Sequence, residues 1–257
     1  DVVTPEMVLC VHGGTGANAI VCYTLCEPGD NIVSILPNYQ QYYSIPESLG
    51  NEVRIYTCDE KSDYKIDFTE LAKLVDSHTK MINLASPNNP TGYALDQSEM
   101  EQLAELARSV GAYVVCDEIY RGLSDDYMPS ICDVYEKGIC TSSTSKVFSS
   151  AGTRVGWIVT RDLSIKDAMM NMRSYHSICE GPINELIAAI ILENKEVFYK
   201  RNTAIVKAAQ DVLKEWLKGQ PHFKPAVESK SSTAFLYYDF DIPAADFAQE
   251  LYDKKST

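Results

Sequence analysis

The sequence predicts an α/β fold in which a mainly parallel sheet lies between two layers of helices. Seven short apolar runs of strand length alternate with longer segments whose apolar residues recur with the period of a helix. This regular alternation is typical of a sheet that is covered on both faces. A chain of 257 residues, 45% of them hydrophobic, is long enough to bury such a core.

The expected elements follow one another along the chain. We expect strands at residues 7–11, 31–36, 52–57, 80–84, 113–116, 139–142 and 155–160, and helices at residues 17–26, 68–76, 97–110, 183–192 and 195–217. Pro28, Gly29 and Asp30 end the first helix, and Asp96 with Glu99 forms a capping-box pattern at the start of the third.

The long last helix is expected to end near a Pro-containing segment, and the chain then changes character. Residues 233–239 predict a strand that opens a second unit. We therefore expect a large domain over residues 1–220 and the beginning of a small α+β C-terminal domain over residues 221–257.

Charge and cysteine usage exclude several classes of partner. The formal net charge is −13, and such a surface repels nucleic-acid phosphates and anionic membranes. No apolar run approaches the roughly 20 residues that span a bilayer, and the first residues have neither the basic region nor the apolar core of a signal peptide. The eight cysteines form no C-x-x-C pair, so we expect reduced thiols, no metal site and a cytoplasmic protein.

Ligands of open α/β sheets bind beyond the carboxyl ends of the strands, and four loops there are unusual. The glycine-rich turn at residues 12–18 leads from a strand directly into a helix, where backbone N–H groups suit a phosphate. The need for a tight turn, without any ligand, would explain the glycines of this segment equally well. Residues 86–92 (SPNNPTG) follow the fourth strand, and turn formation alone would account for them.

The other two loops carry charged side chains. Asp117 follows a strand so apolar that its carboxylate needs a cation or a protonated nitrogen as partner. Residues 141–146 combine hydroxyls with Lys146, and Arg154 follows shortly after. Such a set can hold a phosphate and present an amine.

Taken together and in this order, the four loops closely resemble those of the fold-type I pyridoxal-phosphate enzymes, specifically the class I/II aminotransferase family. The motifs that carry the resemblance are GGTGA at 13–17, PNY at 37–39, NPTG at 89–92, DEIY at 117–120 and STSK at 143–146, with Arg154. The resemblance extends from about residue 3 to residue 239. It implies a three-layer αβα large domain with a mixed, mainly parallel seven-stranded sheet, and a transaminase that uses pyridoxal 5′-phosphate.

The resemblance also implies roles for individual residues. Lys146 resembles the lysine that holds the cofactor as a Schiff base and moves a proton. Asp117 resembles the carboxylate that pairs with the pyridinium nitrogen. Asn89 and Tyr120 correspond to side chains that hydrogen-bond the phenolate oxygen of the ring, and Tyr39 to the aromatic that stacks on it. The expected catalytic residues are Lys146, Asp117 and Tyr120.

The same resemblance implies how the phosphate of the cofactor is bound. Gly14 and Thr15 would offer N–H groups at a helix N-terminus, and Ser143 a hydroxyl. Arg154 would form a bidentate clamp, and Ser145 is a further candidate.

The implied reaction moves the amino group of an L-amino acid to a 2-oxo acid through the Lys146 Schiff base, in a homodimer with shared active sites. A lyase, or an arginine-type oxidase or cyclase of the same fold, would use the same cofactor residues. An aminotransferase-like sensor domain of a transcription regulator is the alternative of another class, although no basic DNA-binding segment appears. A cofactor-binding remnant without activity would usually lack Lys146.

Two parts of the family pattern are expected outside this sequence. They are an N-terminal segment with a tyrosine given to the neighbouring site, and most of a C-terminal domain with the arginine that grips the substrate carboxylate. The sequence therefore names no carboxylate clamp and no particular substrate. Glu180 is either a solvated loop carboxylate or the receptor of a cationic substrate side chain such as that of arginine. We expect His12 to pack at a strand end, with cofactor contact as the alternative.

Overall fold

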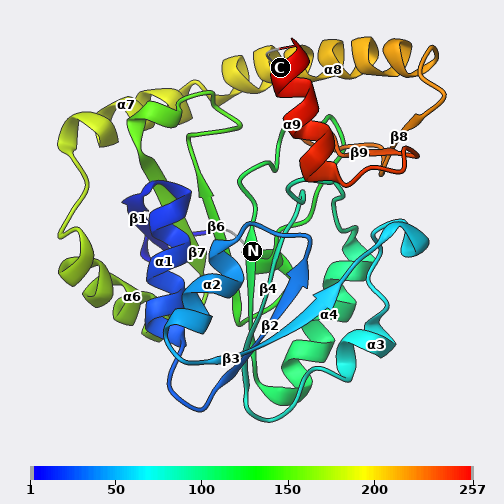
Figure 1. Ribbon diagram of the computed structural model, residues 1–257. Helices are drawn as coiled ribbons and strands as arrows, with labels where there is room; N and C mark the ends of the chain where they lie inside the picture. The colour runs from blue at the N-terminus through cyan, green and yellow to red at the C-terminus, as the bar shows by residue number, and fades with distance from the viewer. Residues whose placement is uncertain (1–2, 256–257) are drawn as a thin grey trace.

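A seven-stranded sheet forms the centre of the computed structural model, which describes residues 3–255 (Figure 1). The strand order is β1-β7-β6-β5-β4-β2-β3. Strand β7 is antiparallel to β1 and to β6, and the other neighbouring pairs are parallel. The strands are β1 (Val8–His12), β2 (Asn31–Leu36), β3 (Glu52–Thr57), β4 (Thr79–Ala85), β5 (Tyr113–Asp117), β6 (Gly138–Ser143) and β7 (Val155–Thr160). The predicted α/β fold with a mixed, mainly parallel sheet is confirmed.

Helices cover both faces of the sheet, as predicted. One face packs against α1 (Gly13–Leu25), α2 (Gln41–Ser48) and α6 (Leu163–His176), and the other against α3 (Phe68–Ala72), α4 (Gln97–Val110) and α5 (Ile131–Val134). Residues of one strand alternate between the two cores: on β4, Met81 belongs to the first and Ile82 to the second. The parallel strands are therefore apolar on both sides.

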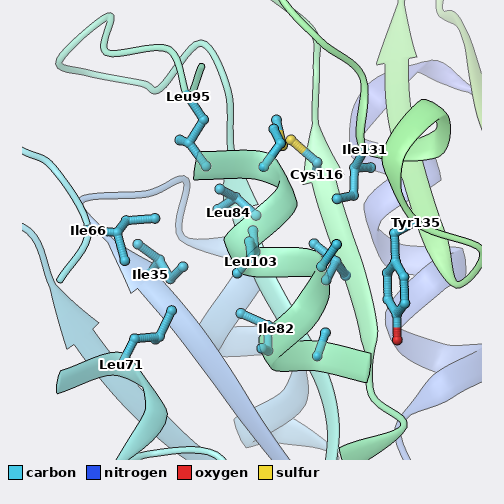
Figure 2. Close-up of a cluster of buried hydrophobic side chains, with 14 of the residues drawn as sticks. Ile35, Ile66, Leu71, Ile82, Leu84, Leu95, Leu103, Cys116, Ile131 and Tyr135 are labelled. Carbon is cyan, nitrogen blue, oxygen red and sulfur yellow. The ribbon is translucent and has the colours of Figure 1, made fainter. Parts of the chain in front are cut away.

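The core beneath α3 and α4 shows how the apolar pattern becomes packing (Figure 2). Leu71 from α3 and Leu103 from α4 belong to one cluster with Ile82 and Leu84 of β4, and all four are almost completely buried. The capping box at the start of α4 is present, because the Asp96 side chain accepts from the backbone N–H of Glu99 and the reverse bond also forms. This core fixes the spacing of the strands whose carboxyl ends carry the predicted site.

Some helix limits differ from the predicted ones for physical reasons. Helix α1 begins at Gly13 rather than at residue 17, because the glycine-rich turn is itself the first turn of the helix. Gly13 enters this turn with a φ of 69°, a left-handed conformation that favours glycine. Helix α3 ends at Ala72 rather than at residue 76. Helices α2 and α6 were not predicted, since few of their residues are buried and the apolar period is weak.

The chain continues through α7 (Pro182–Glu193) and α8 (Lys195–Leu217) to a two-stranded antiparallel sheet and a terminal helix. The sheet consists of β8 (Phe223–Pro225) and β9 (Leu236–Tyr238), which is shorter than the strand predicted at residues 233–239, and the helix is α9 (Ala244–Lys255). In Figure 1 these elements lie beside α8, beyond one end of the large sheet. Short 3₁₀ turns are η1 (Pro5–Met7), η2 (Glu60–Ser62) and η3 (Ala151–Thr153). No helix in the described part of the chain is long and apolar enough to cross a membrane.

Candidate active site

A pocket opens where the strands β4, β5 and β6 end and where α1 begins. It is lined by Gly14, Thr15, Asn18, Tyr39, Ala85, Asn89, Asp117, Ile119, Tyr120, Ser145, Lys146, Ala151 and Arg154. The fold thus brings together nine of the ten predicted site residues from segments more than 130 residues apart in the sequence. The tenth, Ser143, is buried beneath the glycine-rich turn, where its Oγ accepts a hydrogen bond from the backbone N–H of Ser145 at 3.2 Å.

Asp117 lies at the floor of this pocket as the last residue of β5. The backbone N–H of Ile119 donates to its Oδ1 at 3.0 Å, and Asn18 Nδ2 lies 3.4 Å from its Oδ2. Burial raises the pKa of the Asp117 carboxyl, while these hydrogen bonds and the charge of Lys146 act in the opposite direction. A protonated nitrogen in the pocket would therefore favour the ionised carboxylate.

Asn18 is a site residue that the sequence analysis missed. Tyr42 Oη and Thr141 Oγ1 donate to its Oδ1 at 2.9 and 2.8 Å, which leaves the Asn18 amide nitrogen directed at Asp117. Burial raises the pKa of Tyr42 well above its ordinary value, so its hydroxyl stays a donor. The available signal was helical spacing, because Asn18 lies one turn after Gly14 on α1.

The glycine-rich turn and Arg154 form a cradle for an anion. An added Cβ at Gly13 would lie 2.5 Å from Arg154 Nη2, and one at Gly156 would lie 2.5 Å from the carbonyl carbon of Gly13. Glycines at these positions therefore let the guanidinium and β7 approach the start of α1. The Arg154 guanidinium is oriented by Nη1, which donates to the carbonyl of Ala151 at 2.9 Å. The first N–H groups of a helix and a guanidinium together attract a phosphate.

Lys146 and Tyr120 lie close together on the wall of the pocket. Lys146 Nζ lies 5.8 Å from the centre of the Tyr120 ring. Burial raises the pKa of the Tyr120 hydroxyl, and the nearby charge of Asp117 adds to the effect. Tyr39 is 46% exposed, so its ring is available to a ligand in the pocket. The arrangement offers an amine, a phenol and a buried carboxylate around one cavity.

Glu180 and His12 form a separate pair outside the lining of the pocket. Glu180 Oε2 lies 3.2 Å from His12 Nδ1, and the Glu180 side chain is only 2% exposed, against 60% for His12. The interpretation of Glu180 as a solvated loop carboxylate is therefore wrong, because its side chain is almost completely buried. His12 is not packed at the strand end either, since it is mostly exposed and contacts Glu180.

Among the described residues, no group of three His, Cys, Asp or Glu could hold a metal ion.

Comparison with known proteins gives one consistent family. Residues 2–256 match the family model "Aminotransferase class I and II". A pyridoxal-phosphate-dependent aminotransferase structure from Streptococcus suis 89-1591 is 38% identical and superposes with a TM-score of 0.94, covering 98% of this chain and 67% of that one.

Curated relatives are more distant and act, by their names, on different substrates. Nicotianamine aminotransferase 1 of Oryza sativa subsp. japonica is 29% identical over 80% of this chain and 44% of its own length. An aspartate aminotransferase of Sulfurisphaera tokodaii is 26% identical over 98% of this chain and 66% of its own length. The chain thus spans about half to two thirds of the curated relatives that it matches. Its match over nearly every residue shows that it belongs to the class I and II aminotransferase family, whose members depend on pyridoxal phosphate.

Proposed function

We propose that this protein is a transaminase that moves the amino group of an L-amino acid to a 2-oxo acid with pyridoxal 5′-phosphate. The observation that carries the proposal is that one pocket joins Lys146, Asp117 and the anion cradle at Arg154, each from a different loop. An amine, a carboxylate and an anion site match the aldehyde, the ring nitrogen and the phosphate of this cofactor. The comparisons do not favour a lyase, an oxidase or a sensor domain.

The phosphate group fits the cradle at the start of α1. We assign its binding to the N–H groups of Gly14 and Thr15, to the hydroxyls of Ser143 and Ser145, and to Arg154. The hydroxyl of Ser143 lies directly beneath the turn, since a Cβ on Gly14 would be 3.8 Å from its Oγ. A dianion held here is neutralised mainly by Arg154 and by the helix N-terminus.

The ring nitrogen fits the carboxylate at the floor of the pocket. Ionised Asp117 would keep that nitrogen protonated, and Asn18 would hold the carboxylate in place. Asn89 and Tyr120 would hydrogen-bond the phenolate oxygen, and Tyr39 would stack on the ring. When bound, the cofactor supplies an electron-poor ring that accepts charge from the α-carbon of the amino acid.

Lys146 performs the proton transfer in this proposal. Its Nζ would hold the aldehyde carbon of the cofactor at rest, and the free amine would act as the base that moves a proton from the substrate α-carbon. The Tyr120 ring, 5.8 Å from Nζ, restricts the positions that the amine can occupy. The raised pKa of Tyr120 keeps its hydroxyl a donor at neutral pH.

We further propose a homodimer with shared active sites in the cytoplasm. Ile183, Leu186, Ile187 and Ile190 leave an apolar face of α7 between 41% and 74% exposed, which is typical of an interface. Each of the eight cysteines is a free thiol, which favours a reducing compartment. Light scattering on the wild type and on Leu186→Asp would test the dimer: a monomeric wild type would exclude it.

Lys146→Ala tests the cofactor attachment. Wild-type protein mixed with pyridoxal phosphate should develop a visible absorbance band, and borohydride should fix the added mass on the peptide that contains Lys146. Lys146→Ala should lose both signals, whereas Lys73→Ala, a change of an exposed lysine at the C-terminal end of α3, should keep them. Fixation at another lysine would contradict the proposal.

The products of a panel of amino acids test the reaction class. Transamination should yield a 2-oxo acid and an aminated acceptor without free ammonia. Release of ammonia with pyruvate would show a lyase instead, and formation of peroxide would show an oxidase.

A further inference from the structure

Asn88 links two loops that carry predicted ring contacts, although it does not itself line the pocket. It precedes Asn89 in the chain, and its side chain reaches the loop that carries Tyr39. Resting on the proposed function, we propose that Asn88 is a positioning residue that sets Asn89 and Tyr39 relative to each other. It acts through these two residues and does not touch the cofactor.

The side-chain amide of Asn88 uses both of its ends. Its Nδ2 donates to the carbonyl oxygen of Pro37 at 2.6 Å, two residues before Tyr39. Its Oδ1 accepts from the hydroxyl of Thr91 at 2.9 Å and from the backbone N–H of Thr91 at 3.3 Å. One amide therefore closes the Asn89 turn and ties that turn to its neighbour.

The main chain around Asn88 is fixed as well. Its N–H donates to the carbonyl of Tyr93 at 2.7 Å, and its own carbonyl accepts from the N–H of Gly92 at 2.8 Å. Asn88 and Gly92, the residues on either side of the turn, are thus joined by a backbone hydrogen bond. Asn89 lies between them, so its direction into the pocket follows from the closure of the turn.

Gly92, at the other end of the same turn, packs closely against the segment that leads to β9. Lys230 donates its N–H to the carbonyl of Gly92 at 2.8 Å, and a Cβ on Gly92 would lie 1.9 Å from Ser229 Oγ. With a φ of 76°, this position requires glycine. Residues 229 and 230 therefore restrict the position of the turn at its Gly92 end. Among the described residues, Asn88 is the only one whose side chain donates a hydrogen bond to the Pro37 carbonyl.

The test uses the pH dependence of the absorbance of bound pyridoxal phosphate, which reports hydrogen bonding to its phenolate oxygen. Asn89→Ala should raise the pH midpoint by about one unit, because a donor to a charged oxygen is lost. Asn88→Ala should raise it in the same direction by at least about 0.3 unit, and should weaken pyridoxal-phosphate binding about fivefold. Asn88→Asp keeps the acceptor for Thr91 and removes the donor to Pro37, so it should behave in the same way.

A double-mutant cycle separates positioning from a general loss of stability. If Asn88 acts through Asn89, Asn88→Ala should shift the midpoint no further in an Asn89→Ala background. Asn51→Ala is the matched control: it removes an amide that donates to the carbonyl of Glu27 at 2.7 Å, outside the pocket. It should lower the melting temperature without moving the midpoint.

The outcomes of this test and of the proposed function are distinguishable. A wild type without a Lys146-dependent band would contradict the proposed function. A wild type with the band, in which Asn89→Ala moves the midpoint and neither Asn88 variant does, would overturn the positioning role alone. Additive shifts in the double variant would also overturn it.

Discussion

Two neighbouring carboxylates at the end of β5 are both buried but face different surroundings. Asp117 and Glu118 are 6% and 3% exposed, and burial raises the pKa of both. Asp117 lines the pocket. Glu118 is enclosed on the other side, where its Oε1 accepts from Ser130 Oγ at 2.8 Å and from the N–H of Ile131 at 3.0 Å.

The difference indicates that the direction of the side chain, rather than the chemistry of the residue, separates an acid that lines the pocket from one that is enclosed by the protein. Successive side chains point to opposite faces, so Asp117 meets Asn18 and Glu118 meets the start of α5. Arg121 Nε, 3.8 Å from Glu118 Oε2, adds charge compensation. Both acids have protein hydrogen-bond partners, but only Asp117 also lines the pocket.

Replacing Asp117, the acid that we propose pairs with the ring nitrogen, should have the largest effect on activity. Asp117→Asn removes the charge that would hold the ring nitrogen protonated, and we expect kcat/KM for transamination to fall by about 100-fold or more. The pyridoxal-phosphate band should still form, because Lys146 and the anion cradle are unchanged. Steady-state kinetics beside absorbance spectra would measure both.

Wild-type activity in Asp117→Asn would contradict the proposed difference in role between Asp117 and Glu118. Asp126→Asn is a suitable control, since this exposed loop carboxylate pairs with Lys230 away from the pocket lining. It should leave both kcat/KM and the spectrum unchanged.

Removing the structural acid should act on stability instead. Glu118→Ala leaves Ser130 Oγ and the N–H of Ile131 without their acceptor in a buried place, and should lower the free energy of unfolding by about 2 kcal/mol. Denaturant unfolding would measure this loss. The absorbance of the remaining folded protein with pyridoxal phosphate should match wild type, and an altered pH midpoint would show that Glu118 reaches the site after all.

The comparison also explains what the sequence could and could not predict. Asp117 was identifiable because an acid directly after an apolar strand is locally visible, and the alternation of elements located β5 to within one residue. Asn18 was missed because its partner is 99 residues away, so that only the packing of α1 against the sheet brings them together. The pairing of Glu180 with His12 likewise joins residues 168 positions apart, so no local pattern predicts it.

Contacts between loops that are distant in the sequence could not be predicted either. The NPTG motif located Asn89, but the bond from Asn88 to Pro37 joins two turns through space and leaves no local pattern. The weakly amphipathic α2 and α6 were missed because burial of a few residues, rather than a strong period, holds them.

The smallest expected effect concerns the stability of the protein without cofactor. Because burial raises the pKa of Asp117 in the folded state, the folded protein holds this proton more tightly than the unfolded chain does. The ionised carboxylate thus destabilises the fold once the pH exceeds the unfolded pKa of about 3.9. Asp117→Asn should therefore raise the apo melting temperature by about 2 °C at pH 7, with a gain that shrinks as the pH falls through the folded pKa and is gone below about pH 4.

Cofactor should reverse the order of the two proteins in the same melting experiment. A protonated ring nitrogen pairs with ionised Asp117 but not with asparagine, so saturating pyridoxal phosphate should stabilise wild type more than Asp117→Asn. Glu118→Gln keeps an acceptor for Ser130 and should show no such reversal, because it lies on the enclosed side of the strand. An equal gain from cofactor in wild type and Asp117→Asn would mean that Asp117 does not meet the ring nitrogen, and that both acids of this strand end are structural.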